Sequence, residues 1–210
     1  MLKQLGLGVI ALSLSAASFA EDVFQEGKHY TVLENPVRTS NVKKVEVVEA
    51  FGYPCPHCNA FEPQLKAWKA KASGDVVVKE LPVKFGRSWG PYAQAYHTAE
   101  LMKVLDKTHQ LTFDAHHLEQ RRLTNKDDFA ALYAEVGVDK EKFAKAYDSF
   151  AVNMKMRQAD VKLSQYGVDA VPMLFVNGKY RITTDAGTYQ DMLKVVDYLV
   201  EKERALLSAN

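Results

Sequence analysis

Both cysteines of this 210-residue chain lie in one segment, Cys55-Pro56-His57-Cys58, at the junction of two different hydrophobic patterns. Before it, residues 43–51 carry the closely spaced apolar and β-branched side chains of a buried strand, and Gly52 begins a break in that pattern. After it, apolar side chains recur at helical spacing as far as Trp68. The chain must therefore fold so that a buried strand leads directly into a helix whose first turn carries both thiols.

A second strand of β-branched residues is expected over residues 76–83. A strand–helix–strand unit of this kind pairs its strands in parallel through a right-handed crossover. Further along, two apolar runs flank Asn177-Gly178, which is the strongest short hairpin signal, and a last helix is expected from Thr188.

Between these two parts, residues 91–167 show helical patterns throughout. The resulting order is βαβ, a helical block, then ββα. It predicts an α/β, thioredoxin-like fold built from residues 21–90 and 168–210, with residues 91–167 as an inserted all-helical domain.

Two thiols three positions apart at a helix start are expected to form a redox-active pair. The helix N-terminus offers partial positive charge and unpaired N–H groups, which favour the thiolate of Cys55. Cys55 is therefore expected to be the sulfur that a substrate thiolate attacks, and Cys58, one turn further in, to be buried and to act as leaving group and resolving thiol. A disulfide closing so short a loop would remove little unfolded-state entropy, which disfavours a purely structural role.

The two residues between the cysteines fit the same role. His57, when protonated, would add a positive charge close enough to stabilise the Cys55 thiolate. Pro56 fixes its own φ and has no N–H, which stiffens the turn into the helix. We therefore include His57 and Pro56 with Cys55 and Cys58 among the expected catalytic residues.

Residues 49–63, Glu-Ala-Phe-Gly-Tyr-Pro-Cys-Pro-His-Cys-Asn-Ala-Phe-Glu-Pro, resemble the active-site segment of the DsbA family of bacterial periplasmic thiol:disulfide interchange oxidases. Val171-Pro172 and the Phe-Val-Asn-Gly-Lys-Tyr of residues 175–180 resemble that family's second hallmark, and the similarity spans the whole mature chain. The resemblance implies a strongly oxidising disulfide, no cofactor beyond the Cys55–Cys58 pair, and reoxidation by a membrane oxidase of the DsbB type.

The same resemblance implies roles for residues outside the motif. It predicts a cis Val171–Pro172 bond facing the cysteines, with the Val171 backbone free to bind an extended substrate. Strand alternation places Glu49 on an apolar face, where a carboxyl needs a partner, and the family pattern supplies a lysine that matches Lys79. We expect a buried Glu49–Lys79 pair beneath Cys58 that handles its proton. Glu62 matches a further acidic position of the family.

The first 20 residues predict an export signal that is removed near Ala20. Lys3 precedes an apolar stretch that is shorter than the ~20 residues of a membrane span, and small residues follow at Ser18 and Ala20. This predicts a location in the periplasm of a Gram-negative bacterium. With 27 basic and 26 acidic residues in the whole chain, the charge is close to neutral, which argues against nucleic acid as a partner.

The expected activity is oxidation of reduced exported proteins by a monomeric enzyme, and two alternatives remain open. One is a periplasmic reductant or isomerase kept as a dithiol, although the mature chain leaves little room for the dimerisation domain that most such proteins carry. The other is a non-catalytic carrier that binds metal through its cysteines and histidines. The cysteine and histidine spacing fits no zinc-finger pattern, so no metal site is expected. The remaining histidines are predicted to be solvated surface residues: His29, His97, His109, His116 and His117.

Overall fold

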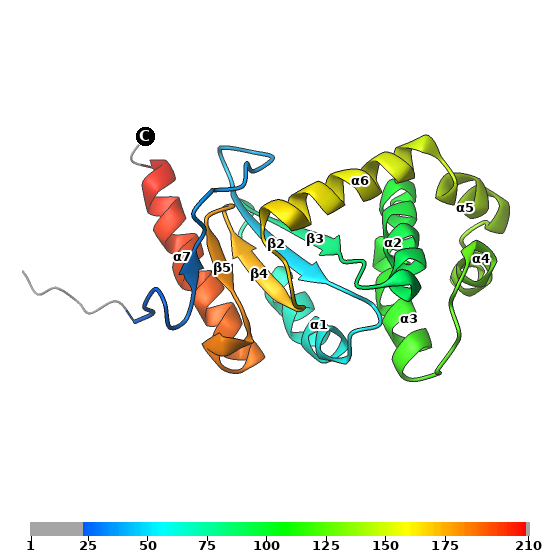
Figure 1. The fold of residues 1–210 in the computed structure, drawn as a ribbon, viewed down its shortest axis with the longest axis horizontal. Helices are drawn as coiled ribbons and strands as arrows, with labels where there is room; N and C mark the ends of the chain where they lie inside the picture. Colours follow the sequence, from blue (N-terminus) through cyan, green and yellow to red (C-terminus); the bar gives the residue numbers. More distant parts are fainter. Residues whose placement is uncertain (1–22, 209–210) are drawn as a thin grey trace, which may run out of the picture.

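A five-stranded mixed sheet forms the centre of the fold in a computed structural model that describes residues 23–208 (Figure 1). The strands are β1 (Thr31–Val32), β2 (Val45–Phe51), β3 (Val76–Pro82), β4 (Met173–Val176) and β5 (Tyr180–Ile182). They lie in the order β1-β5-β4-β2-β3, and only β2 and β3 pair in parallel. The predicted parallel unit and the predicted hairpin are both confirmed, whereas β1 was not expected from the sequence.

Helices account for most of the remaining chain. They are α1 (Pro56–Lys69), α2 (Gly90–Met102), α3 (Leu105–His117), α4 (Lys126–Ala134), α5 (Lys140–Tyr147), α6 (Phe150–Gln165) and α7 (Tyr189–Ser208). Helices α2 to α5 gather on one side of the sheet, and α6 runs from them back to the strands (Figure 1). The element order confirms the α/β, thioredoxin-like fold with helices between its two halves.

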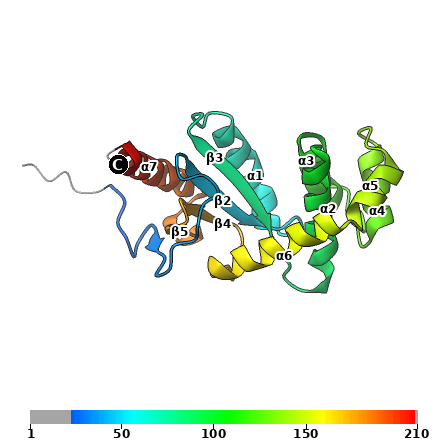
Figure 2. The ribbon, with the colours of Figure 1, turned by 90° about the horizontal axis from the view of Figure 1, so that it is seen from above.

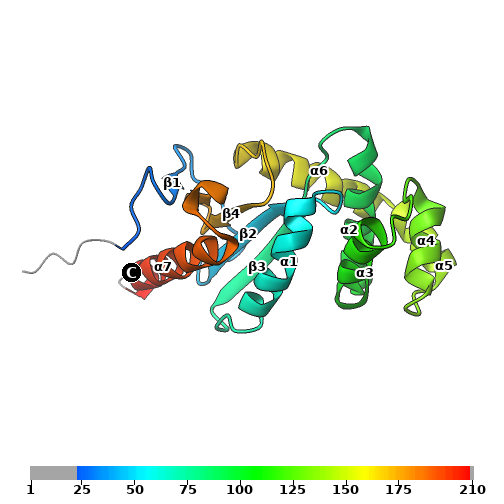
Figure 3. The same ribbon diagram turned by 90° about the horizontal axis from the view of Figure 1, so that it is seen from below.

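The two faces of the sheet are covered by different helices, as the opposite views in Figures 2 and 3 show. One face bears Val45 and Val47 of β2, which pack in a buried cluster with α1 and α7. The other bears Val48 and Ala50, which cluster with Leu163 of α6. Because both faces of β2 are covered, all seven of its residues are buried, and any polar side chain in this strand must find its partners inside the protein.

The tight turn between β4 and β5 depends on its two central residues. Asn177 and Gly178 both have positive φ, 49° and 66°, as a two-residue hairpin turn requires. A Cβ atom on Gly178 would lie 1.8 Å from the carbonyl oxygen of Val37, so only glycine fits there. This turn sets the register of the strand that follows Pro172.

No helix among residues 23–208 combines the length and the apolar character needed to cross a membrane. The export signal predicted for residues 1–20 lies outside the described residues.

Candidate active site

Cys55 is the N-cap residue of α1. Its extended backbone (φ −83°, ψ 118°) lets its Sγ accept the N–H of Cys58 at 3.4 Å. Pro56 is the first residue of the helix, a position whose N–H has no partner within the helix, so its missing N–H costs no hydrogen bond. Both cysteines are thiols here, so the geometry is that of the dithiol form.

The structure separates the two thiols by burial. Cys58 is fully buried, and Cys55 retains 6% of its surface. Cys58 points into the core shared with Phe51 and Tyr53, while Cys55 lies at the edge of that core. The predicted burial of Cys58 is confirmed, and of the two sulfurs only that of Cys55 can be approached from outside.

The surroundings drive the acidities of the two thiols apart. A hydrogen bond from the Cys58 thiol lowers the pKa of Cys55 from 9.0 to about 6 despite partial burial, and the backbone N–H groups of Cys58 and His57 and the charge of His57 act in the same direction. Burial raises the pKa of Cys58 far above 9.0, and the Cys55 hydrogen bond and the charge of Glu49 add to this. At neutral pH the dithiol form therefore holds one thiolate, on Cys55, and one proton, on Cys58.

His57 is exposed at the surface. Its Nδ1 is 3.3 Å from the hydroxyl of Tyr189, the first residue of α7. The ring is therefore held near Cys55 by a side chain from the other end of the chain, which sequence analysis did not identify.

The Val171–Pro172 peptide bond is cis, as predicted. It faces the cysteines, because Cys55 Sγ lies 3.5 Å from the Val171 carbonyl oxygen. The loop before β4 thus brings a backbone carbonyl to the sulfur that a substrate would reach first.

The predicted Glu49–Lys79 pair is wrong, and the strand register gives the reason. Glu49 pairs with Glu80 across β2 and β3, while Lys79 pairs with Val48 and projects from the opposite face of the sheet. There Lys79 binds the buried Glu46, with Nζ and Oε2 2.9 Å apart. Glu49 is buried as expected, but no side chain or backbone group in the described chain forms a hydrogen bond with its Oε2.

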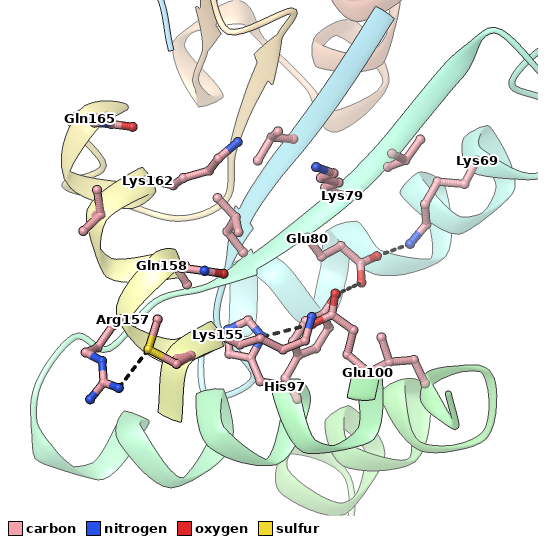
Figure 4. Close-up of a pocket in the computed structure, with 18 residues that line it drawn as sticks. Lys69, Lys79, Glu80, His97, Glu100, Lys155, Arg157, Gln158, Lys162 and Gln165 are labelled. Atoms are coloured by element: carbon pink, nitrogen blue, oxygen red, sulfur yellow. Dashed lines mark hydrogen bonds and ion pairs between the residues drawn. The ribbon is translucent and has the colours of Figure 1, made fainter. Parts of the chain in front are cut away.

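The lysine on the Cys58 side of the sheet is Lys69, from the last turn of α1. Its Nζ bonds to Glu80 and lies 4.0 Å from Glu62 Oε1. Figure 4 shows the Glu80 side chain directed toward Lys69, whereas Lys79 extends away from it. Burial and the negative charges of Glu80 and Glu62 raise the pKa of Glu49 well above 4.5, which Lys69 only partly offsets. Glu49 therefore keeps its proton to a higher pH than an ordinary carboxyl does.

Glu62 is buried one helical turn beyond Cys58 and faces a histidine that was predicted to be a surface residue. His109 of α3 is 9% exposed, and its Nε2 lies 3.4 Å from Glu62 Oε2. His97 is buried as well, so the prediction of solvated histidines is wrong for both. Sequence alone did not show this because burial of α2 and α3 depends on how the helices pack against the motif.

Helix α3 also holds the loop before the cysteines, and sequence analysis missed this contact. The Tyr53 hydroxyl lies 2.8 Å from His109 Nδ1, and His117 Nε2–H donates to the Tyr53 carbonyl at 2.7 Å. His109, Phe113 and His117 recur at i, i+4 and i+8, so this spacing was a signal that one face of α3 is aromatic and buried.

A groove of about 920 Å³ lies at the outer edge of β3, between α2 and α6 (Figure 4). Its lining includes Lys79, Glu80 and Lys162 but neither cysteine. The redox pair thus lies apart from this groove, with Cys55 next to the Val171 carbonyl.

The chain is similar to known proteins over most of its length. A family model described as a DSBA-like thioredoxin domain matches residues 90–196. The thiol:disulfide interchange protein DsbA of Pseudomonas aeruginosa is 42% identical over 194 residues, which cover 92% of this chain and 92% of the relative. The chain belongs to the DsbA family.

Other members of the DsbA family agree in sequence and in fold. DsbA of Azotobacter vinelandii is 38% identical over 201 residues, which cover 95% of this chain and 94% of the relative. The crystal structure of Pseudomonas aeruginosa DsbA superposes with a TM-score of 0.84 at 42% identity and covers 88% of this chain and 97% of that one. As a DsbA family member, the protein is a thiol:disulfide interchange oxidoreductase, and the Cys55–Cys58 pair fits its redox centre.

Proposed function

We propose that this protein oxidises reduced exported proteins by passing on its Cys55–Cys58 disulfide through a mixed disulfide on Cys55. The observation that carries the proposal is the opposite displacement of the two thiol pKa values, that of Cys55 down to about 6 and that of Cys58 up. A stabilised thiolate lowers the free energy of the dithiol form relative to the disulfide form. The disulfide is therefore a good oxidant.

In the first step a substrate thiolate attacks Cys55 Sγ. The Cys55–Cys58 bond breaks, and its electron pair leaves on Cys58, which takes up a proton. We propose that the Glu49 carboxyl, whose raised pKa lets it keep a proton, supplies this proton to Cys58. Glu49 is buried on the Cys58 side of the sheet, and its negative charge, once the proton has left, acts on the Cys58 thiol.

In the second step the other substrate thiol loses its proton and attacks the substrate sulfur of the mixed disulfide. Cys55 leaves as a thiolate that His57 and the N-terminal N–H groups of α1 stabilise. Glu49 then takes up one of the two protons that the substrate thiols release, which replaces the proton it gave to Cys58. The substrate gains a disulfide, and the protein gains two electrons and one proton. The second proton goes to solvent.

The loop at Val171-Pro172 is the proposed substrate-binding segment. The Val171 carbonyl lies next to Cys55, where it can accept an N–H from an extended peptide that presents its cysteine to the same sulfur. Such main-chain binding requires no particular side chains, which suits an enzyme that acts on many proteins.

We further propose that the protein works as a monomer in the periplasm, after removal of the leader that ends near Ala20. No cofactor enters the exchange, because the two sulfurs themselves hold the electrons. A membrane oxidase of the DsbB type would then restore the disulfide.

The experiment that tests the oxidase function is equilibration of the protein with glutathione redox buffers, with the dithiol fraction measured at each ratio. We expect a couple far more oxidising than thioredoxin, whose potential is about −270 mV. A potential near the thioredoxin value would instead support the reductant alternative and contradict our proposal.

A further inference from the structure

Three side chains from three different elements converge on the Cys58 side of the sheet: Glu62 of α1, Glu80 of β3 and His109 of α3. His109 Nε2 lies 3.4 Å from Glu62 Oε2 and 3.9 Å from Glu80 Oε2. One ligand atom from each residue falls within 4.8 Å of the other two. Glu62 and His109 are buried, and Glu80 is nearly so, with 11% of its side chain exposed.

The oxygens of the two carboxylates are divided between different partners. Lys69 faces the Oε1 atom of both Glu62 and Glu80, while both Oε2 atoms are turned toward His109. The hydroxyl of Tyr96 donates one hydrogen bond to Glu80 Oε2, at 3.2 Å, which leaves a second lone pair on that oxygen. Lys69 therefore does not occupy the space between the Oε2 atoms and the imidazole.

His109 Nε2 is enclosed, yet within residues 23–208 it makes no hydrogen bond. A buried nitrogen without such a bond is costly, and here it points at two carboxylate oxygens. The other ring nitrogen, Nδ1, lies 2.8 Å from the Tyr53 hydroxyl. Metal-binding histidines have this arrangement, in which the second nitrogen is fixed by a hydrogen bond and the first is left to the ion.

The spacing and the surroundings fit an ion of a particular class. Zinc ligands at about 2.0–2.2 Å in a tetrahedron lie roughly 3.3 Å apart, close to the separations between His109 Nε2 and the two oxygens. A cavity of about 180 Å³ is lined by all three residues and gives room for a water as fourth ligand. A nitrogen ligand beside carboxylates favours zinc and similar transition metals over calcium or magnesium, which prefer oxygen alone.

We propose that Glu62, Glu80 and His109 bind one divalent transition-metal ion, of which Zn²⁺ fits best, at a site separate from the cysteines. The ion adds positive charge beside Glu49, Glu62 and Glu80, whose negative charges Lys69 only partly offsets.

The test uses the tag-free protein in its disulfide form, so that neither cysteine can bind metal. Zn²⁺ is titrated by calorimetry and Co²⁺ by its visible absorption. We expect one ion per chain in the wild type and, in His109→Gln and Glu80→Gln, affinity lower by roughly 100-fold or more, because even supporting residues around a metal contribute 10- to 100-fold. His116→Gln, which changes a histidine of the same helix that faces Tyr92 instead, should bind as the wild type does.

Failure of the wild type to bind either ion, or equal binding by His109→Gln, would overturn the proposal. Should the variants fail to fold, the wild type with ¹⁵N-labelled histidine provides the answer: Zn²⁺ must shift the Nε2 resonance of His109, and shifts confined to other histidines would contradict the site. The measurement needs no substrate and no free thiol, so its outcome is independent of the oxidase function.

Discussion

At the scale of single residues, the first turn of α1 shifts the pKa values of its two neighbouring thiols in opposite directions. Cys55 is the N-cap residue and lies among hydrogen-bond donors, whereas Cys58 is enclosed by apolar side chains and lies near the Glu49 carboxyl. The contrast depends on position in the helix more than on residue type, since both residues are cysteines. Changes to the groups around Cys55 should therefore change its acidity without moving the fold.

The first such change is His57→Ser. Loss of a positive charge should raise the pKa of Cys55 from about 6 toward 9.0 and make the disulfide less oxidising. The rise should cover less than half of that interval, because hydrogen bonds from Cys58 remain. Titration of the thiolate absorbance in the ultraviolet measures the pKa directly, and an unchanged titration curve would exclude a role for His57.

The second prediction at this scale concerns stability and pH. The folded protein lowers the Cys55 pKa from 9.0 to about 6, so between these values the unfolded chain binds more protons. The thiolate should then stabilise the dithiol protein fully above pH 9, progressively less toward pH 6, and not at all well below it. The slope is at most about 1.4 kcal/mol per pH unit and is reduced by solvent screening, since Cys55 keeps some contact with water.

Urea unfolding of the dithiol protein and of Cys55→Ala, at pH 5 and pH 8, checks this prediction. The stability difference between the two proteins should be larger at pH 8. The same difference at both pH values would show that Cys55 is an ordinary thiol in the folded protein.

At the scale of elements, the register of β3 decides which charges reach the redox pair. Successive residues Lys79 and Glu80 project from opposite faces, so Glu80 lies on the Cys58 side with Lys69, and Lys79 lies on the α6 side with Glu46. A shift of one residue would exchange the two sets of charges. The pairing of β2 with β3 therefore determines which charged side chains lie near the redox pair.

Two lysine variants test this register. Lys69→Met removes the cation that Glu62 and Glu80 share, so we expect a loss of stability on the order of 2 kcal/mol and a less oxidising equilibrium with glutathione. Lys79→Met is the matched control, because it removes one of the two lysines beside Glu46 on the other face, where Lys162 remains 3.7 Å from Glu46 Oε1, and it should leave the redox equilibrium unchanged. A larger redox effect of Lys79→Met would contradict the observed register.

Sequence patterns predicted the elements well where the signal was local. The strand before Cys55, the Asn177-Gly178 turn and the helix after Pro56 each follow from residues adjacent in the chain. The partner of Glu49 depends on strand register, a long-range property, and the family pattern of a lysine in the next strand led to Lys79. Lys69 could have been found, since it lies two helical turns after Glu62 on the same face of α1.

In the helical block too, the elements follow from local patterns, whereas their contacts depend on long-range packing. We propose that residues 91–167 form an insertion within the thioredoxin-like part made of residues 21–90 and 168–210, because the sheet and the helices α1 and α7 share one buried cluster. The contacts of His109 and His117 with Tyr53 join the two parts at the redox site. No local pattern could give these contacts, because they need α3 to be packed against the motif first.

At the scale of the whole molecule, the reduction potential and the folding stability of the two redox forms are thermodynamically linked. Groups that stabilise the Cys55 thiolate act only when the disulfide is open, so they favour the dithiol form of the folded protein. Each 30 mV by which the folded couple is more oxidising than the unfolded one corresponds to about 1.4 kcal/mol of this preference.

We therefore expect the dithiol form to unfold at a higher urea concentration than the disulfide form at pH 7. This is the reverse of the usual stabilisation by a disulfide. Parallel unfolding curves of the two forms give the difference, and a more stable disulfide form would contradict both this prediction and a strongly oxidising couple.

The contact between Cys55 and the Val171 carbonyl joins residues 116 positions apart. Synthesis runs from the N-terminus, so both thiols emerge from the ribosome long before the loop that completes their surroundings. During that interval β2 also lacks β4, and Thr31 lacks its partner Arg181 in β5. A nascent chain that stops short of residue 171 therefore carries the whole Cys-Pro-His-Cys motif without the Val171 carbonyl beside Cys55 and without β4 beside β2.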